Sequence, residues 1–377
     1  MTAQRGDRAL RVGYVLGTTE GGTGRHVSML AQGIAAAGID VQVFGPDSTR
    51  ELFSGIAFEP IAISDRPHPA RDTAAMRRLR SLLMAMKADV VHAHGMRAGA
   101  LCVLALRPFA GERPASAGRW PGSRPPALVV TVHNAPPSGA SAAVVYGLLE
   151  RLVAGNADVV LCVSADLSAR MRRLGAEVVG RAIVPAPALR SAGDRPADLP
   201  GDRPLILAAG RLAPQKGFDT LVAAAARWRN RHPEPLVAIA GAGPLAGSLA
   251  DQATATGADV RLLGKRDDMT DLLAAADVFA LPSRWEGQPL ILQEAMHACR
   301  PIVAADVGGV RDLTGDDAAL LVRPGDPTAL AAAVLSVLDD LGLASRLSKA
   351  AAQRAAALPT EADAIAASVD LYERLSQ

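Results

Sequence analysis

The stretch LRVGYVLGTTEGGTGRHVSMLAQGIAAAG, residues 10–38, carries the pattern that decides the fold. Its first part, 10–16, is a short apolar run that predicts a β-strand. A glycine-rich loop follows and opens into a segment with apolar residues at helical spacing, which Gly38 ends. A strand, a loop and a helix in this order are the repeating unit of a fold with a parallel sheet.

The same unit recurs in two series along the chain. Apolar runs in the first series predict strands at 40–44, 89–92, 128–132 and 158–163, and in the second at 205–209, 236–240, 260–263, 278–281 and 302–304. Helical segments lie between them, so we expect an α/β protein with two doubly wound, Rossmann-like domains. The proline-rich stretch 185–204 predicts a linker between domains spanning 1–184 and 205–360. We expect the last helix, 361–377, to pack back on the first domain.

Length and composition limit the class of protein. The chain has 377 residues, 49% of them hydrophobic and 21% charged, with a net charge of +2, which excludes a wholly disordered chain. No apolar run approaches the roughly 18 residues of a membrane-spanning helix. The N-terminus does not read as a secretory signal, and the three cysteines favour a reducing cytoplasm, where we expect them to be core residues.

One segment allows a peripheral membrane contact. Residues 71–87 (RDTAAMRRLRSLLMAMK) predict an amphipathic helix with arginines beside its apolar side. Such a helix could rest on an anionic membrane, but packing against the sheet is the more common arrangement and the one we favour.

Two common nucleotide-binding motifs are missing. GAGPLAG, 241–247, has its third glycine one position too late for the dinucleotide fingerprint, and no P-loop sequence occurs. Both facts disfavour a nicotinamide-dependent dehydrogenase and a P-loop ATPase.

Two glycine loops follow predicted strands and suit a phosphate. GGTG, 21–24, opens a helix whose free N–H groups could face an anion, although a plain tight turn is equally compatible. GRLAPQKG, 210–217, follows the first strand of the second series, at the edge where such sheets bind ligands. Arg211 and Lys216 could clamp a diphosphate there, whereas the alternative is two solvated side chains.

A third cluster, EGQPLILQE at 286–294, follows the predicted strand 278–281. The carboxylates of Glu286 and Glu294 could accept hydrogen bonds from sugar or ribose hydroxyls. The alternative for Glu294 is an ordinary exposed helix residue, although its helix is rather apolar. Farther back, His92 and His94 share one face of a strand end, and a polar role there is favoured over metal binding.

Taken together, these motifs resemble a known family. PSRWEGQPLILQEAMHACRPIVAADVGGVRDL (282–313) and AAGRLAPQKGFDTLVAA (208–224) carry most of the resemblance, supported by GGTGRHV, VVHAHG and TVHN. The chain resembles a retaining nucleotide-sugar glycosyltransferase of the GT-B fold, of the glycosyltransferase family 4 type. That fold implies an acceptor-side N-terminal domain and a nucleotide-sugar-binding C-terminal domain facing across a cleft.

The resemblance also implies roles for residues. It places Gly22 and Gly24 at the donor phosphate, and Arg211 and Lys216 on the diphosphate leaving group. It implies that the nucleotide base meets Gly241, Gly243, Lys265 and Arg266, and that Glu294 binds the ribose hydroxyls. The donor sugar is implied to meet Glu286 and the residues that follow it, Gly287, Gln288, Pro289 and Leu290. His133 is implied beside the reacting sugar carbon, with His94 and Asn134 on the acceptor side. The sequence departs from the family pattern at Cys299, where a glycine is usual.

The function implied is transfer of a sugar, with retained anomeric configuration, from a nucleotide-diphosphate sugar to a hydroxyl acceptor. A UDP-sugar is the first candidate donor and a GDP-sugar the second, with no metal and no other cofactor. The acceptor is expected to be a small or lipid-linked molecule of polysaccharide, glycolipid or glycoconjugate biosynthesis, and no nucleic-acid partner is expected. A GT-B nucleotide-sugar 2-epimerase and a non-catalytic sugar-nucleotide-binding protein stay open as alternatives.

Overall fold

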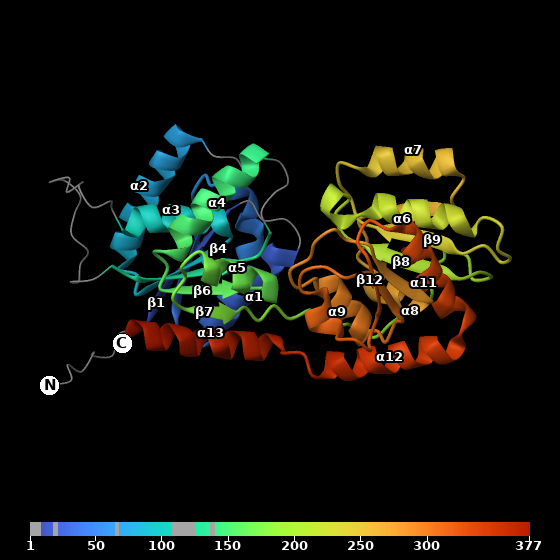
Figure 1. Ribbon diagram of the computed structural model, residues 1–377. Helices are drawn as coiled ribbons and strands as arrows, with labels where there is room; N and C mark the ends of the chain where they lie inside the picture. Colours follow the sequence, from blue (N-terminus) through green and yellow to red (C-terminus); the bar gives the residue numbers. More distant parts are fainter. Residues whose placement is uncertain (1–8, 18–21, 65–67, 108–124, 136–139) are drawn as a thin grey trace. The chain divides into compact units, whose positions relative to one another are not determined.

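The computed structural model describes residues 9–17, 22–64, 68–107, 125–135 and 140–377 (Figure 1). These residues form two compact units. Unit 1 holds the described residues up to Val184 together with Pro359–Gln377, and unit 2 holds Pro185–Leu358. Each unit is built on its own parallel sheet.

Unit 1 contains a seven-stranded sheet in the order β3-β2-β1-β4-β5-β6-β7. Its strands are β1 (Arg11–Leu16), β2 (Asp40–Gly45), β3 (Ala57–Pro60), β4 (Val90–His94), β5 (Ala127–Val132), β6 (Val159–Cys162) and β7 (Val179–Arg181). Its helices are α1 (Gly22–Ala36), α2 (Pro69–Met86), α3 (Met96–Leu106), α4 (Ala140–Ala154), α5 (Ala165–Arg173) and α13 (Glu361–Ser376), with a 3-10 helix η1 (Asp47–Phe53).

Helices cover both faces of this sheet, which is why its central strands are buried and mostly apolar. Every residue of β4 is buried, as are all but the first of β1 and β5. The helices α2 and α3 lie on one face, while α1 and α13 lie together on the other (Figure 1). The C-terminal helix α13 therefore belongs to unit 1, where it buries Ala364 and Tyr372.

Unit 2 contains a six-stranded parallel sheet in the order β10-β9-β8-β11-β12-β13. Its strands are β8 (Leu205–Ala209), β9 (Leu236–Ala240), β10 (Val260–Gly264), β11 (Val278–Leu281), β12 (Ile302–Ala305) and β13 (Leu320–Val322). Its helices are α6 (Phe218–Ala225), α7 (Ala246–Thr256), α8 (Met269–Ala275), α9 (Leu290–His297), α10 (Val310–Thr314), α11 (Pro327–Asp339) and α12 (Leu341–Ala356), with 3-10 helices η2 (Pro214–Lys216) and η3 (Ala226–Trp228).

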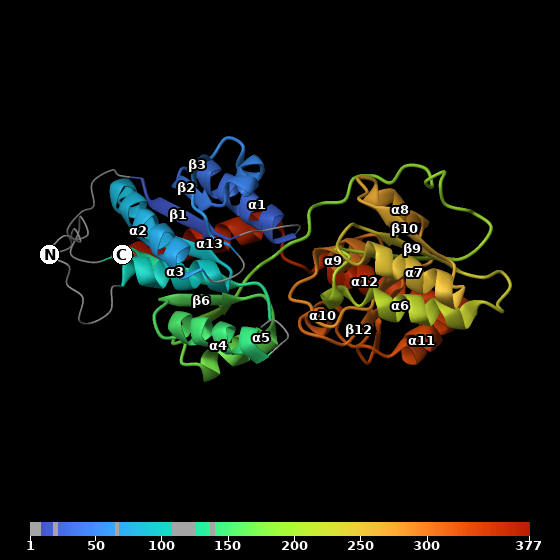
Figure 2. The same ribbon diagram turned by 90° about the horizontal axis from the view of Figure 1, so that it is seen from above.

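Alternate residues of β8 point into two separate cores. Leu205 and Leu207 pack with residues of α9 and α12, whereas Ile206 and Ala208 pack with residues of α6 and α11. In Figure 1, α6 and α7 lie on the same side of β8 and β9, and the view from above in Figure 2 shows α6 and α7 next to each other. The prediction of two doubly wound α/β domains is thus confirmed.

Some elements were not predicted from the sequence. The strands β3, β7 and β13 lie at sheet edges, are three or four residues long and are half-buried or exposed, so they lack the apolar run that marks a central strand. The proline-rich stretch 185–204 has no helix or strand, and it is part of unit 2. There the Ala186 N–H donates to Gln293 Oε1 at 3.0 Å, and the Gly193 N–H donates to Asp271 at 2.6 Å.

The amphipathic segment 71–87 forms most of α2. It buries Leu79 and Leu83, and the Arg80 guanidinium donates to the carbonyl of Ala105 at 2.7 Å, while Arg77 and Arg78 are exposed. Packing on the sheet, the arrangement favoured from the sequence, is therefore present. Within the described residues no single helix has the length and apolar character to cross a bilayer, and one sharply bent pair, Pro327–Asp339 with Leu341–Ser376, passes on length and composition only.

The expectation that all three cysteines are core residues is wrong for one of them. Cys102 and Cys162 are buried, but Cys299 is exposed. It lies just past the end of α9 with φ of +54°, a left-handed conformation. The Cys299 N–H donates to Met296 O and the Arg300 N–H to Ala295 O, both at 3.0 Å. This is the Schellman pattern, whose left-handed position usually holds glycine.

Candidate functional site

The sheet of unit 2 reverses its winding between β8 and β11. Strands β9 and β10 continue on one side of β8, and β11 to β13 on the other. In open α/β sheets, ligands bind beyond the carboxyl ends of the strands at this reversal. The loop with Arg211 and Lys216 follows β8, and the loop with Glu286 follows β11. The fold thus brings two of the three sequence clusters to one place.

Lys216 and Glu286 form an ion pair at this point. Lys216 Nζ lies 2.6 Å from Glu286 Oε1, and the Ser283 hydroxyl donates to the same oxygen at 2.6 Å. Glu286 is 4% exposed and Ser283 is fully buried. A buried carboxylate needs such partners, because it has lost its water. An ammonium has three donors, so this pairing leaves Lys216 able to bind a phosphate oxygen.

Polar contacts join the two loops around this pair. Gln215 Nε2 donates to the carbonyl of Trp285 at 3.0 Å, and the Arg284 N–H donates to the carbonyl of Gln215 at 2.8 Å. The Arg284 guanidinium makes a two-pronged ion pair with Asp219, with contacts of 2.6 and 2.9 Å. That guanidinium holds the pKa of the Asp219 carboxyl below its ordinary value. Lys216 and Glu286 therefore sit on loops that are fixed to one another.

A third loop, after β12, holds the backbone of Glu286. The Gly309 N–H donates to the carbonyl of Glu286 at 3.0 Å. Gly308 has φ of +50°, and a Cβ placed on it would lie 1.8 Å from the same carbonyl oxygen. Only glycine allows this approach. No role was predicted from the sequence for Gly308 and Gly309, although both lie within the stretch that carries the resemblance.

Gly241 and Gly243 are explained by close packing of backbones. Gly241 has φ of +139°, and a Cβ on it would lie 1.9 Å from the carbonyl oxygen of Gly210. A Cβ on Gly243 would lie 2.5 Å from the carbonyl oxygen of Leu212. The loops after β8 and β9 thus touch through these glycines. Their contact with a nucleotide stays a prediction.

Glu294 lies on α9 and is 6% exposed, so the alternative of an ordinary exposed helix residue is wrong. The residues Gly287, Gln288 and Pro289 lead into this helix, and Leu290 is its first residue. The first N–H groups of a helix have no acceptor within it, which favours a negatively charged or hydroxyl ligand at this end. The predicted roles of these residues at the ribose and sugar are compatible with the geometry and stay predictions.

Lys265, Arg266 and Arg211 differ in their surroundings. The Arg266 guanidinium pairs with Asp268 at 2.6 Å and with Asp198 at 2.7 Å, and these carboxylates raise its pKa. Lys265 and Arg211 are exposed. Arg266 thus has a structural role in holding the segment around Asp198, and its predicted place beside a base stays a prediction.

Unit 1 has its own reversal point, between β1 and β4. His94 ends β4, His133 follows β5, and His26 lies on α1. His94 Nδ1 lies 3.2 Å from His133 Nε2, and the rings of His26 and His133 are 6.0 Å apart. We call His26, His92, His94 and His133 the histidine cluster. His26 was not predicted from the sequence, although it lies in the GGTGRHV motif.

Burial keeps the histidine cluster uncharged. It lowers the pKa of His26 to about 4 and that of His133 to about 3. Neutral imidazoles offer one N–H donor and one acceptor each, which suits hydroxyl groups. Within the part of the chain that the structure describes, no group of three His, Cys, Asp or Glu side chains is arranged to hold a metal ion.

The remaining predicted residues of unit 1 lie at the start of α1 and just after β5. Gly22 is the first residue of α1 and Gly24 is buried in its first turn, whereas Gly21 lies outside the described residues. Asn134 is exposed, and its carbonyl accepts a hydrogen bond from the Tyr146 hydroxyl at 2.9 Å.

Comparison with known proteins decides the family. Residues 20–185 match the family described as Glycosyltransferase Family 4, and residues 203–340 match Glycosyl transferases group 1. A glycogen synthase of Mycobacterium tuberculosis is 31% identical, over 89% of this chain and 86% of that protein. The chain belongs to the family 4 glycosyltransferases. A phosphatidyl-myo-inositol mannosyltransferase of Mycolicibacterium smegmatis is 30% identical to this glycosyltransferase, over 85% of this chain and 82% of that one.

Solved structures show that the glycosyltransferase has the GT-B fold. Sucrose-phosphate synthase from Thermosynechococcus elongatus superposes with a TM-score of 0.76 at 20% identity, covering 97% of this chain and 99% of that one. HepE of Anabaena, in complex with UDP and glucose, gives a TM-score of 0.76 at 18% identity, covering 97% and 100%. The fold, family and transferase activity expected from the sequence are thus confirmed.

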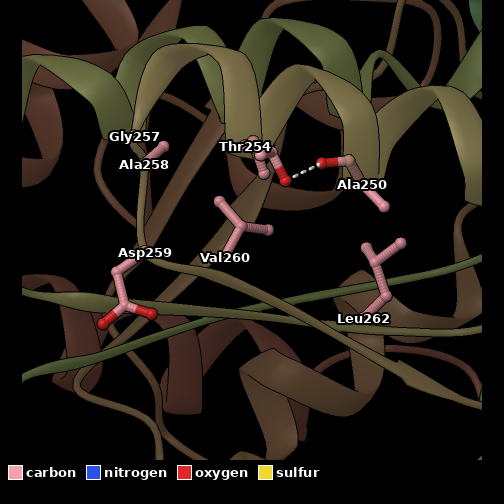
Figure 3. A pocket seen from close by; sticks show the side chains of 8 residues that line it. Ala250, Thr254, Gly257, Ala258, Asp259, Val260 and Leu262 are labelled. Atoms are coloured by element: carbon pink, nitrogen blue, oxygen red, sulfur yellow. Dashed lines mark hydrogen bonds between the residues drawn. The ribbon is translucent and has the colours of Figure 1, made fainter.

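One hollow of the glycosyltransferase lies away from the residues described so far. It has a volume of about 530 Å³ and lies between α7 and β10 (Figure 3). Its walls are mostly small or apolar side chains, such as Ala250 and Val260. The charged Asp259 is paired with Arg203 at 2.5 Å, and Thr254 donates to the carbonyl of Ala250 at 3.0 Å. Its polar groups already have partners, so it offers little to a sugar nucleotide.

Proposed function

We propose that this glycosyltransferase moves a sugar from a UDP-sugar to a hydroxyl acceptor and retains the anomeric configuration. The observation that carries the proposal is the Lys216–Glu286 pair at the reversal point of the unit 2 sheet. It combines a cation suited to a diphosphate with a carboxylate suited to sugar hydroxyls. A GDP-sugar is the second candidate donor.

The chemistry follows from the charges that develop. The bond between the anomeric carbon and the diphosphate oxygen breaks, so negative charge grows on the diphosphate. Lys216, and Arg211 from the same loop, would stabilise that charge, and preorganised stabilisation of this kind is usually the largest part of catalysis. The acceptor oxygen bonds to the same face of the anomeric carbon, and its proton passes to a diphosphate oxygen. The products are a glycoside and UDP.

Other residues complete the proposed roles. Glu286, held by Ser283 and by the Gly309 N–H, would orient the donor sugar through its hydroxyls, and Glu294 would bind the ribose. His133, as a neutral imidazole, would lie beside the reacting carbon and the acceptor, with His94 and Asn134 on the acceptor side. Because cationic side chains would neutralise the leaving group, we propose that no metal ion is required.

The donor can be identified by a thermal-shift screen of UDP-, GDP- and ADP-sugars. A ligand at 100 times its dissociation constant stabilises the folded state by about 2.7 kcal/mol. We expect a shift with one UDP-sugar that persists in EDTA and shrinks in Lys216→Ala, while the exposed control Lys349→Ala keeps it. A shift with GDP-sugars alone would identify a GDP-sugar as the donor instead. The absence of a shift with every sugar nucleotide would contradict the proposal.

Turnover separates the proposal from its two alternatives. NMR of the donor with candidate hydroxyl acceptors should show a new glycoside with the donor's anomeric configuration. A donor converted to its 2-epimer without any acceptor would indicate an epimerase instead. Binding without turnover of any acceptor would indicate a sugar-nucleotide-binding protein.

We further propose a cytoplasmic enzyme of polysaccharide, glycolipid or glycoconjugate biosynthesis. A lipid-linked acceptor would bring it to an anionic membrane through the exposed side of α2, where Arg77 and Arg78 lie; Arg78 also approaches Glu59 at 3.6 Å. Co-sedimentation with phosphatidylglycerol vesicles should fall in the Arg77→Ser/Arg78→Ser double variant. Unchanged sedimentation of this variant would remove the membrane contact from the proposal.

A further inference from the structure

A chain of buried hydroxyl and imidazole groups crosses the core of unit 1. The hydroxyls of Tyr14 and Tyr372 are 2.8 Å apart, and the Tyr372 hydroxyl lies 2.5 Å from His92 Nδ1. His92 Nε2 lies 2.7 Å from the Thr131 hydroxyl. None of these four side chains is more than 1% exposed. Tyr372 reaches this chain from the C-terminal helix α13, 280 positions away from His92.

The hydrogens of this chain can run in either of two directions, and both satisfy the two ring nitrogens of His92. If Tyr14 donates to Tyr372 and Tyr372 donates to His92 Nδ1, then His92 Nε2 carries the proton and donates to Thr131. In the reverse direction Thr131 donates to His92 Nε2, and the hydrogen of the Tyr14 hydroxyl is left at the end of the chain. The first direction is favoured because the phenol of Tyr372 is a stronger donor than the aliphatic hydroxyl of Thr131. We therefore assign His92 the tautomer with its proton on Nε2.

His92 connects this chain to the residues at the sheet edge. Its ring stacks on that of His94 with centroids 4.2 Å apart, and the Tyr14 ring stacks on His94 at 5.4 Å. His94 Nδ1 in turn contacts His133 Nε2 at 3.2 Å. A rotation of His92 would therefore displace His94, and with it the partner of His133.

We propose that Tyr372 is a positioning residue: its hydroxyl fixes the tautomer and ring orientation of His92, and through the His92–His94 stack it holds His133 in place. The inference rests on the role proposed for His133 at the reacting sugar. It gives α13 a part in the reaction that its distance in sequence from the site motifs does not suggest. Tyr372 acts through other side chains and does not itself touch the substrate.

The test compares two variants that each remove one buried hydroxyl. Tyr372→Phe removes the donor to His92 and keeps the ring, whereas Tyr14→Phe keeps the Tyr372–His92 contact. With UDP release from UDP-glucose as the assay, Tyr372→Phe should lower kcat about 10- to 100-fold, because a small misplacement of a reacting-site group has effects of this size. KM for UDP-glucose should stay within about twofold, and Tyr14→Phe should lower kcat less than about threefold.

A second readout does not depend on turnover. ¹⁵N NMR of histidine-labelled protein should show His92 as a single tautomer in the wild type and in Tyr14→Phe, and as a mixture in Tyr372→Phe. An unchanged His92 signal in Tyr372→Phe, an unchanged kcat, or equal losses of kcat in the two variants would each overturn the inference. A wild type that releases no UDP would instead exclude UDP-glucose as the donor, and the tautomer of His92 would still test the inference, so the two failures are distinguishable.

Discussion

Lys216 Nζ lies 2.6 Å from Glu286 Oε1, although 70 positions separate the two residues in the chain. Both side chains are largely buried, so removing either one would leave the charge of the other without its partner. The same pair is proposed to bind the two ends of the reacting bond, the diphosphate and the sugar. Stability and activity should therefore be linked at this site.

The first prediction concerns the two basic residues after β8. Lys216→Ala should lower turnover about 100-fold or more by removing charge from the leaving group. It should also cost about 2 kcal/mol of unfolding free energy, because Glu286 loses its cation. Arg211→Ala should lower turnover similarly but change stability by less than about 0.5 kcal/mol, since Arg211 is exposed.

These effects are measured by kcat for donor turnover and by urea unfolding, with assays run where each variant stays folded. The exposed residues Arg227 and Lys349 provide matched controls, Arg227→Ala and Lys349→Ala, which should leave turnover unchanged. Normal rates in both Lys216→Ala and Arg211→Ala would refute the assignment of the diphosphate clamp.

The second prediction concerns Gly308. A Cβ there would lie 1.8 Å from the carbonyl oxygen of Glu286, at φ of +50°. Gly308→Ala should therefore destabilise unit 2 by about 2–3 kcal/mol and displace Glu286. The control, Gly247→Ala in α7, meets no atom within 4 Å and should stabilise by about 0.5–1 kcal/mol. Chemical denaturation measures both, and equal stability of the two variants would contradict the packing argument.

The third prediction concerns Cys299 at the end of α9. Its φ of +54° is a left-handed conformation that costs a residue with a Cβ about 1 kcal/mol. Cys299→Gly should therefore raise the unfolding free energy by about 1 kcal/mol, measured by urea unfolding under reducing conditions. Cys299→Ala, which keeps the Cβ, is the control and should not stabilise. A Cys299→Gly protein no more stable than Cys299→Ala would argue against the strain.

The fourth prediction concerns pH. Burial lowers the folded-state pKa of His26 to about 4, and burial together with the neighbouring imidazoles lowers the pKa of His92 and His133 to about 3, against 6.5 for the ordinary side chain. Above pH 6.5 both folded and unfolded states are neutral at these positions. As the pH falls from 6.5 toward 4, the unfolded chain takes up protons that the folded state does not, so stability falls.

The expected loss is on the order of 3 kcal/mol for His26 alone. Urea unfolding at pH 7, 6, 5 and 4 measures it, and His26→Phe should flatten part of the slope. If the unfolding free energy of the wild type stayed constant from pH 7 to pH 4, these imidazoles would take up protons in the folded state as they do in the unfolded chain, which would contradict the prediction.

Much of the architecture could be predicted because its signals are local. Runs such as LILAA at 205–209 are apolar on both faces, since helices cover both sides of a parallel sheet. The loops with Lys216 and Glu286 could also be predicted to bind a ligand, because each follows a strand and the carboxyl ends of parallel strands meet at one edge of the sheet. The edge strands β3 and β13 carry no such signal, since they are short and only partly buried.

The order of residues in the chain by itself determined the two doubly wound sheets, the family and the loops where the basic and acidic side chains lie. Only the tertiary structure decided that Ser283 and Lys216 share one oxygen of Glu286, that Gly308 admits no side chain, and that Tyr372 contacts His92. The reason is physical. Strand and helix patterns depend on neighbours a few residues apart, whereas these contacts depend on where separate loops and a distant helix meet after the sheets have formed.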